Sequence, residues 1–180
     1  MQKELRGEVL YQNSMIPSKR RIKKAYLVMQ DPDYQLFTDS VYQELLLALS
    51  DQKDKDEKRI DDILDELNLT IYKERHPMSL SGGQKQRCAV ARALITNPRL
   101  VLADEPTGAL DSKAANALLN VFGEVNRQGQ TILMVTHSAQ AASRASRVLF
   151  IKDGEVFHQI YRGEKTKEEM YQMISDTLTI

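Results

Sequence analysis

The chain has 180 residues, 42% of them hydrophobic, which is enough for one domain with a buried core but short for two. Its 25 basic and 25 acidic residues balance, and this excludes a protein that binds nucleic acid or a membrane surface through a general basic excess. A single cysteine, Cys88, excludes an internal disulfide framework, and no stretch is apolar for long enough to span a bilayer, so we expect a cytoplasmic chain without direct membrane insertion.

Two short strands are predicted in the first part of the chain, at Gly7 to Leu10 and at Ala25 to Met29. A basic run at residues 19–24 lies between them. Such a run can bind phosphate, but like charges that cluster in sequence are more often simply exposed. We therefore interpret this run as a solvated loop or edge strand.

Helices are predicted for residues 40–68 and for Gly82 to Ile95. In the first region four apolar side chains recur at the spacing of one helix face: Ile60, Ile63, Leu64 and Leu67. The second helix should stop at the Asn97-Pro98 pair, because proline disfavours helical geometry in the residue before it.

Strand and helix then alternate. Leu100 to Ala103 and Thr131 to Thr136 are predicted strands, and the residues between Ala114 and Val125 have apolar side chains at helical spacing. Gly129 supplies a left-handed stop to that helix. The alternation predicts an α/β fold with a mostly parallel sheet and helices on both faces, which places its chemistry at the carboxyl ends of the strands.

The C-terminal part is predicted to hold a β-hairpin and a helix. Arg147 to Ile151 and Glu155 to Tyr161 flank Asp153-Gly154, a strong hairpin signal. Apolar residues at helical spacing then predict an amphipathic helix that packs on the core: Met170, Met173, Ile174 and Leu178.

The helix at residue 82 begins within the segment Leu80, Ser81, Gly82, Gly83, Gln84. The glycines let a ligand approach backbone N–H groups that have no partner in the first turn, and such a helix start attracts phosphate. Ser-Gly-Gly alone is better explained as an ordinary serine-capped helix. The full stretch LSGGQKQRCAVARAL, however, closely resembles the signature motif of the ABC transporter ATPase family.

Two adjacent acids end the strand from Leu100. This segment resembles the Walker B element, and the resemblance implies that Asp104 holds Mg²⁺ while Glu105 polarises the attacking water. An apolar strand that ends in two acids is only moderately specific by itself. The spacing strengthens the match, because Asp104 lies twenty residues after Gln84, which leaves room for one helix and one strand, as in the family.

Two further segments match the family downstream. Ala109, Leu110 and Asp111 resemble the D-loop, which implies that Asp111 contacts the opposite subunit. Asp111 is also a suitable N-cap for the next helix, and the two roles are compatible. His137 follows the strand from Thr131, where the family has a histidine that contacts the terminal phosphate.

Upstream, Gln30 lies in a segment, Met29-Gln30-Asp31-Pro32, that resembles the Q-loop. The resemblance implies that Gln30 reaches the magnesium ion and the attacking water and reports nucleotide state to the membrane partner. Leu36, Phe37 and the run Leu45 to Leu47 either line the surface where helices of a transmembrane partner dock or form the core of a helical subdomain.

Three other side chains receive no chemical role. Cys88 lies among alanines and is interpreted as a small core residue, since no motif pairs it with a histidine. We expect His76 and His158 to be bystanders.

The resemblance spans about Gly7 to Tyr161 and implies one partial ABC ATPase domain over residues 1–180. It implies a P-loop NTPase-like sheet with an ABC helical subdomain at about 39–95, a Walker B, D-loop and H-loop core at 96–161, and a C-terminal helix at 162–180. It also implies ATP and Mg²⁺ as cofactors. The implied partners are a second ABC ATPase domain and transmembrane permease subunits, with no nucleic acid, at the inner face of the cell membrane.

The phosphate-binding loop G-x-x-x-x-G-K-[ST] is missing, because none of the eight glycines is followed by lysine. In the family this loop precedes the Q-loop, so we expect a truncated chain that begins after the loop and its strand. One cation at such a site changes turnover about a thousandfold, or roughly 4 kcal/mol. The isolated chain should therefore be nearly inactive, expose an apolar edge beside the strands at Thr131 and Arg147, and be poorly stable.

We expect an ATP-hydrolysing subunit that pairs with a second ATPase domain and couples hydrolysis to transport through membrane partners. The alternative is a catalytically inactive half-domain that binds or regulates a complete ABC ATPase. The stretch MQDPDYQLFTDSVYQELLLAL resembles energy-coupling importers for metal ions and vitamins. ADEPTGALDSKAANALL resembles ATPases of peptide and antibiotic exporters, so the direction of transport stays open.

Overall fold

The computed structural model describes residues 10–11, 14–15, 17, 24–49 and 57–179. The strand predicted at Gly7 to Leu10, except its last residue, lies outside these ranges, as do residues 19–23 of the basic run. The described part begins with a short antiparallel pair, β1 (Leu10–Tyr11) and β2 (Ser14–Met15).

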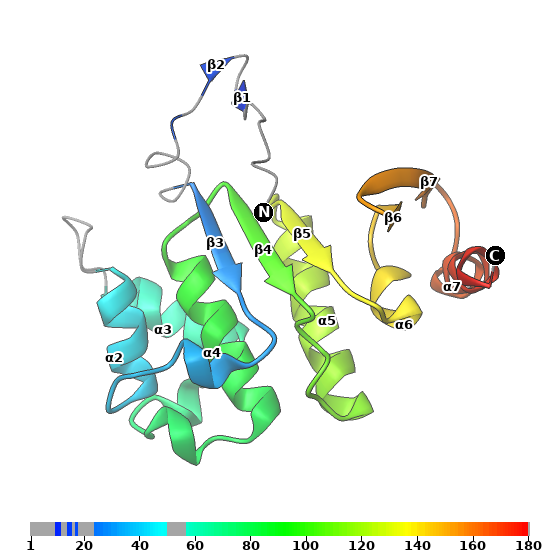
Figure 1. The fold of residues 1–180 in the computed structure, drawn as a ribbon. Helices are drawn as coiled ribbons and strands as arrows, with labels where there is room; N and C mark the ends of the chain where they lie inside the picture. The colour runs from blue at the N-terminus through cyan, green and yellow to red at the C-terminus, as the bar shows by residue number, and fades with distance from the viewer. Residues whose placement is uncertain (1–9, 12–13, 16, 18–23, 50–56, 180) are drawn as a thin grey trace, which may run out of the picture.

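A parallel sheet forms the centre of the fold. Its strands have the order β3, β4, β5, with the bounds β3 (Ala25–Val28), β4 (Leu100–Asp104) and β5 (Ile132–Val135). Ala103 pairs with Val28 on one side and with Met134 on the other, so the strands end almost level. Figure 1 shows the three arrows side by side and pointing the same way. The residues that follow each strand therefore meet at one edge of the sheet.

Two long helices lead into the strands. Helix α4 (Gly82–Ile95) precedes β4, and α5 (Ser112–Arg127) precedes β5, so the predicted helix from Gly82 to Ile95 is confirmed. Each helix ends a few residues before its strand begins, as Figure 1 shows. Each therefore runs back along the sheet and starts at the edge where the strands end.

Shorter helices lie next to α4 and next to one another. They are η1 (Pro32–Tyr34), α2 (Val41–Ala48), α3 (Glu57–Glu66), η2 (Thr70–Tyr72) and η3 (Pro77–Ser79). The region predicted as helical at residues 40–68 thus contains α2 and α3, and the predicted stripe lies against the core. None of the described helices is both long and apolar enough to cross a membrane.

The two faces of the sheet differ in burial. Val28 and Ala103 are at most 2% exposed and share one core with α4 and α5. On the opposite face Leu27, Leu133 and Val135 are 45%, 52% and 60% exposed. Within the described residues, helices therefore cover one face and leave the other apolar and open.

This one-sided cover follows from the topology. The strands follow one another in sequence and in space, and right-handed crossovers that proceed in one direction place their helices on the same side of a sheet. The predicted α/β class with a parallel sheet is confirmed, whereas helices on both faces are not found among the described residues. The expected apolar edge is present, since Leu133 and Val135 on β5 are exposed and β5 pairs only with β4 among the described strands.

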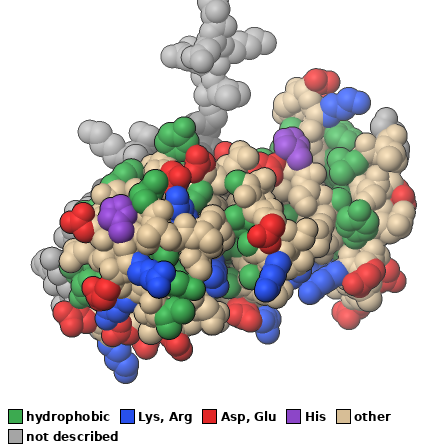
Figure 2. Space-filling view, turned by 90° about the horizontal axis from the view of Figure 1, so that it is seen from below, with side chains coloured by type: hydrophobic (Ala, Val, Ile, Leu, Met, Phe, Trp, Pro, Cys, Tyr) green, Lys and Arg blue, Asp and Glu red, His purple; other side chains and the backbone are tan. Residues whose placement is uncertain are grey.

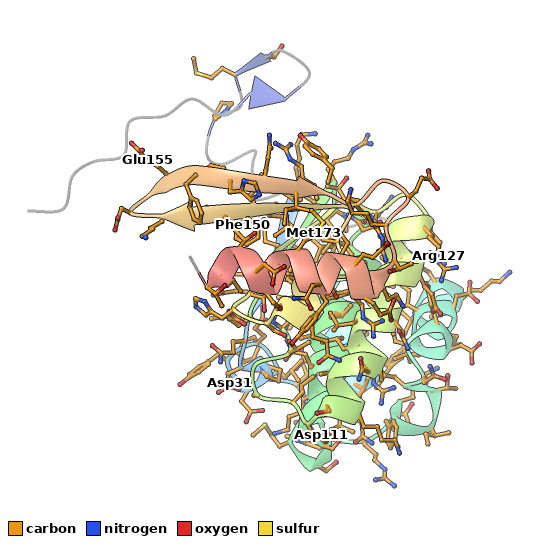
Figure 3. All side chains as sticks on the ribbon, turned by 90° about the vertical axis from the view of Figure 1, so that its right-hand side faces the viewer. Asp31, Asp111, Arg127, Phe150, Glu155 and Met173 are labelled. Atoms are coloured by element: carbon orange, nitrogen blue, oxygen red, sulfur yellow. The ribbon has the colours of Figure 1, made fainter. Side chains whose placement is uncertain are left out.

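A second core lies in the C-terminal part. Its elements are α6 (Ala139–Ala142), β6 (Arg147–Lys152), β7 (Glu155–Tyr161) and α7 (Lys167–Leu178). The predicted hairpin turns at Asp153 and Gly154, both with positive φ. Phe150, Met170 and Ile174 are buried together, and Figure 3 shows α7 running alongside the hairpin.

A buried ion pair connects three elements of the first core. Arg92 Nη1 on α4 donates to Glu44 Oε2 on α2 at 2.9 Å, and Arg92 Nε donates to the Tyr26 hydroxyl on β3 at 3.0 Å. The other Glu44 oxygen accepts the backbone N–H groups of Phe37 and Thr38. Because every buried charge here has partners, the group fixes the segment after β3 against α4 without leaving an unpaired charge.

The apolar residues after β3 were considered either as core of the helical region or as a surface where a transmembrane partner docks. Some of them are buried and others are exposed. Leu36 and Leu45 are buried in the core, and Leu46 packs against it. Phe37 and Leu47 are exposed.

Cys88 is buried in α4, as predicted for a core residue. Burial, and next the charge of Glu44, raise the pKa of its thiol to about 12, although Arg92 acts in the opposite direction. A thiol held neutral is a poor nucleophile.

Replacing Leu133 and Val135 together by threonine should lower binding of the dye ANS about twofold or more, because these side chains are the exposed apolar surface of β5. Threonine keeps the β-branched shape that suits a strand. Ile71→Thr is the matched control, since Ile71 is 80% exposed but lies in η2, away from the sheet. Dye fluorescence that fell equally in both variants would contradict a specific apolar face.

Alkylation of Cys88 by iodoacetamide at pH 8 should be roughly a thousandfold slower in the folded chain than in denaturant, since the pKa rises from 9.0 to about 12 and the thiolate is the reactive form. The unfolded thiol ionises first, so unfolding becomes easier as pH rises from about 9 towards about 12. Mass spectrometry follows the reaction at this single cysteine. Equal rates in the two states would contradict its burial.

Candidate functional site

Polar residues from three neighbouring strands meet at the carboxyl edge of the sheet. Gln30 follows β3, Glu105 follows β4, and Thr136 and His137 follow β5. The helices α4 and α5 also start at this edge. The structure therefore brings most of the residues predicted from the motifs to one end of the molecule.

The carboxylate of Glu105 bridges from β4 to the end of β5. One oxygen accepts the backbone N–H of His137 at 2.6 Å, and the other accepts the Thr136 hydroxyl at 3.0 Å. Glu105 has a φ of +42°, a left-handed conformation that is uncommon for a residue other than glycine. The side chain is only 18% exposed, so these hydrogen bonds aim it along the strand ends and not into bulk water.

The imidazole of His137 is 99% exposed, and its Nε2 lies 3.8 Å from Glu105 Oε1. Its backbone N–H, and not its ring, makes the close contact with the acid. The ring is therefore free to contact a ligand outside this chain.

Asp104 and Gln30 are both exposed at the same edge. The Asp104 carboxylate forms no hydrogen bond or ion pair with any described residue. A Cβ added to Gly108 would lie 2.9 Å from Gln30 Nε2, so the turn after β4 approaches the Gln30 side chain closely. No group of three acidic, histidine or cysteine side chains that would hold a metal ion by themselves is found in the described ranges.

Gln35 stabilises the end of β3, a role that the sequence motifs did not indicate. Its Oε1 accepts the Met29 N–H, and its Nε2 donates to the Leu27 carbonyl, each at 2.8 Å. The side chain thus pairs with the outer edge of β3 as a neighbouring strand would. Thr136 was also missed, although its position next to His137 was a usable signal.

The predicted phosphate-attracting helix start begins with a capping box. Gln84 N donates to Ser81 Oγ at 3.4 Å, while Ser81 N donates to Gln84 Oε1 at 2.9 Å. The serine-capped helix considered from the sequence is therefore present. The N–H groups of Gly82 and Gly83 have no partner among the described residues and remain available to a ligand.

The same helix start packs against the predicted D-loop. A Cβ added to Gly83 would lie 2.8 Å from the Cβ of Ala114 in α5, whereas one added to Gly82 would meet only Leu110 Cδ2 at 3.7 Å. Gly83 thus has a packing requirement in addition to any role toward a ligand. Leu80 is buried beneath the turn.

Asp111 caps α5, as its position predicted: its carboxylate accepts the Ala114 N–H at 2.9 Å. Ala109 is exposed and Leu110 packs partly against the core. Figure 3 shows Asp111 and Asp31 toward the same end of the molecule. The D-loop therefore lies at the same edge as the end of β3.

The other two histidines have structural contacts. His76 Nδ1 accepts the Met78 N–H at 3.1 Å and so caps η3, and the ring of His158 packs on Phe150. Neither belongs to the strand-end cluster, as expected.

Figure 2 views the molecule from the end toward which the strands point. Acidic and basic side chains are interspersed on this face, without a large area of one sign. The mixed charge of this face agrees with the balanced charge of the sequence. It also fits a site that recognises its ligand through a few specific side chains and not through a general electrostatic field.

Comparison with known proteins shows which family the chain is similar to. The family described as ABC transporter matches residues 1–108. The bacitracin export ATP-binding protein BceA of Halalkalibacterium halodurans is 40% identical over 163 residues, which are 87% of this chain and 64% of that protein. The chain spans 57 to 64% of the length of such curated ATP-binding proteins.

Two solved structures share the fold. The structure of cbiO1 from Clostridium perfringens, part of the ABC transporter complex cbiONQ, has a TM-score of 0.81 at 29% identity and is matched over 98% of this chain and 77% of that one. A dimeric ATP-binding cassette in a post-hydrolysis state, bound to ADP and Pi, has a TM-score of 0.70 at 30% identity, with 87% and 74% covered.

Gly83→Ala should lower the free energy of unfolding by about 1–3 kcal/mol, because its methyl group would overlap the Cβ of Ala114. Gly82→Ala is the matched control and should be neutral or stabilising by up to about 1 kcal/mol, since its methyl group meets an ordinary contact. Urea unfolding measures both. Adding Ala114→Gly to Gly83→Ala should recover part of the loss, and equal effects at the two glycines would refute the packing account.

Proposed function

This chain belongs to the ABC transporter family, and from that membership we propose that it is an ATP-hydrolysing subunit that couples hydrolysis to transport through membrane partners. Members of this family bind ATP, and a structural relative is dimeric with ADP and Pi bound. The observation that carries the proposal is the Glu105 carboxylate, held at the carboxyl edge by the ends of β5.

Glu105 is the proposed general base. Each carboxylate oxygen accepts one hydrogen bond from β5 and keeps a lone pair for a water molecule. Because Thr136 and the His137 backbone fix its orientation before water arrives, little reorganisation is needed when that water attacks the terminal phosphate. The exposed imidazole of His137 is then placed to steady the charge that develops on the phosphate.

Asp104 and Gln30 are the proposed Mg²⁺ ligands. Mg²⁺ in such sites takes one or two carboxylates and completes its shell with substrate phosphates and water, so the absence of a three-ligand cluster in the described ranges fits this ion. Bound Mg²⁺ would neutralise charge on the phosphates. Asp104 offers a carboxylate without a described partner, and Gln30 offers an amide at the same edge of the sheet.

The start of α4 is proposed to face nucleotide held by a second ATPase domain. These 180 residues contain no Gly-Lys pair that could hold phosphate, whereas the N–H groups of Gly82 and Gly83 are unpartnered among the described residues. Ser81 and Gln84 fix this turn, and Asp111 in the neighbouring D-loop is proposed to contact the partner. A dimer with a domain that supplies a phosphate-binding loop would thus be the working unit.

Permease subunits are the proposed membrane partners. The family match implies them, and Tyr34 and Phe37 after β3 are exposed aromatic side chains that such a partner can cover. The chain would then lie in the cytoplasm at the inner face of the membrane. We assign this contact to the helical region at about residues 39–95 and its leading loop, with the catalytic core at 96–161 and the C-terminal helix at 162–180.

A second candidate function is an inactive half-domain that binds or regulates a complete ABC ATPase. The lack of a Gly-Lys pair favours it, since the phosphates of a nucleotide at this chain's own strand ends would have no lysine from these 180 residues. Under this function the chain supplies only the α4 start to a partner's nucleotide.

A mixing experiment tests both functions. Alone, the chain should bind a fluorescent ATP analogue no more tightly than about millimolar, because these 180 residues offer the phosphates no loop lysine. Mixed with the bacitracin export relative, it should raise ATP hydrolysis, and Ser81→Arg should abolish the increase by placing bulk and charge at the α4 start. No increase with wild-type chain would contradict both functions.

Glu105→Gln separates the two. If this chain hydrolyses ATP, the increase should fall about a hundredfold or more, as for loss of a general base. If the chain is a half-domain, the increase should stay the same. Glu124→Gln, an exposed acid in α5, is the matched control and should leave the increase unchanged under both functions.

A further inference from the structure

Helix α4 is joined to the loop that carries Gln30 by two adjacent side chains near its start. Gln86 Nε2 donates to the Met29 carbonyl at 2.9 Å, and Lys85 Nζ lies 2.8 Å from Asp33 Oδ1. The first contact is buried, since Gln86 is 1% exposed, and the second lies nearer the surface. The loop is thus attached to α4 on both sides of Gln30.

The buried amide of Gln86 is only half satisfied. Its Oε1 is buried and accepts no hydrogen bond from any described residue. Leaving a buried acceptor unpaired costs at least as much free energy as one net hydrogen bond gains. The Gln86 conformation that bonds the Met29 carbonyl is therefore only weakly preferred over one in which the amide turns to other partners. A ligand can shift the populations of two conformations that are so close in free energy.

A displacement of α4 would pass directly to Gln30. The α4 start is held rigid by its capping box, and Gln86 lies one turn further along the same helix. The carbonyl that Gln86 holds belongs to Met29, the residue before Gln30. On the other side of the loop, the Gln30 amide lies close to Gly108 in the turn after Glu105.

We propose that Gln86 is a positioning residue through which the start of α4 sets the placement of Gln30. The inference rests on the proposed function, because it makes nucleotide contact at α4 adjust the Gln30 amide, which lies close to the turn after Glu105. Lys85 and Asp33 act with it as a weaker, solvent-screened second attachment.

Hydrogen exchange of residues 29–35 tests the attachment without nucleotide. Amides in this segment are protected by hydrogen bonds, including those from Met29 N–H to Gln35 Oε1 and from Gln35 N–H to the Pro32 carbonyl. Gln86→Met keeps the length and apolar stem of the side chain but removes the amide, and exchange of the segment should rise about tenfold, the factor for one hydrogen bond. Exchange in α7 should not change.

Lys85→Met is the matched variant on the neighbouring residue. It should raise exchange in the same segment by about threefold or less, because the ion pair is partly exposed. If Gln86→Met fails to fold, Lys85→Met still tests the attachment, because this substitution leaves the core untouched. Unchanged exchange at residues 29–35 in the variants, or an equal rise in α7, would overturn the proposal.

The coupling itself is tested with ATP and the bacitracin export relative. Exchange at residues 29–35 of the wild-type chain should change on adding ATP to the mixture, and Gln86→Met should lose most of that change. A response of full size in Gln86→Met would overturn the coupling. No response in wild type would count against the proposed function instead, while the nucleotide-free comparison still decides the attachment.

Discussion

The level ending of three parallel strands is the constraint on which the candidate site depends. Parallel pairing of β3, β4 and β5 fixes the distance between Gln30, Glu105 and His137 regardless of what the intervening helices do. The left-handed φ of Glu105 costs about 1–2 kcal/mol. Its bonds to Thr136 and the His137 backbone offset that cost, so the strained turn persists only because β5 ends beside it.

The sequence predicted the structure well where signals within a single segment, such as helix caps and turn residues, agree with the fold. The bounds of α4 followed from a serine cap, a glycine start and a proline beyond the end, and these act within one segment. The hairpin at Asp153-Gly154 followed in the same way. The strands of the sheet were found because each is a short, continuous apolar run, the pattern of a strand in a parallel sheet.

What the sequence did not predict arises from contacts between distant segments. Gln35 acts as a substitute strand beside β3, and no pattern of spacing marks a glutamine for that role. The partner of the Gln86 amide is the Met29 carbonyl at the end of β3, which lies far away in the sequence, so the role of Gln86 can be recognised only in the folded chain. Strand order determines that the helices cover only one face of the sheet. The periodicity of a helix shows that one side of the helix is buried, but it does not show which face of the sheet that helix covers.

The open face and the site are connected by the same strands. Leu27 on β3 and Leu133 and Val135 on β5 project from the sheet on the side away from α4 and α5. Gln30 follows β3 and His137 follows β5, so the same two strands lead from the open face to the site. Whatever covers that face must therefore end beside the acid and the amide. Burial there would also lower the local dielectric around Glu105 and strengthen each electrostatic interaction at the strand ends. Cover of this apolar face would therefore also change the surroundings of the candidate site.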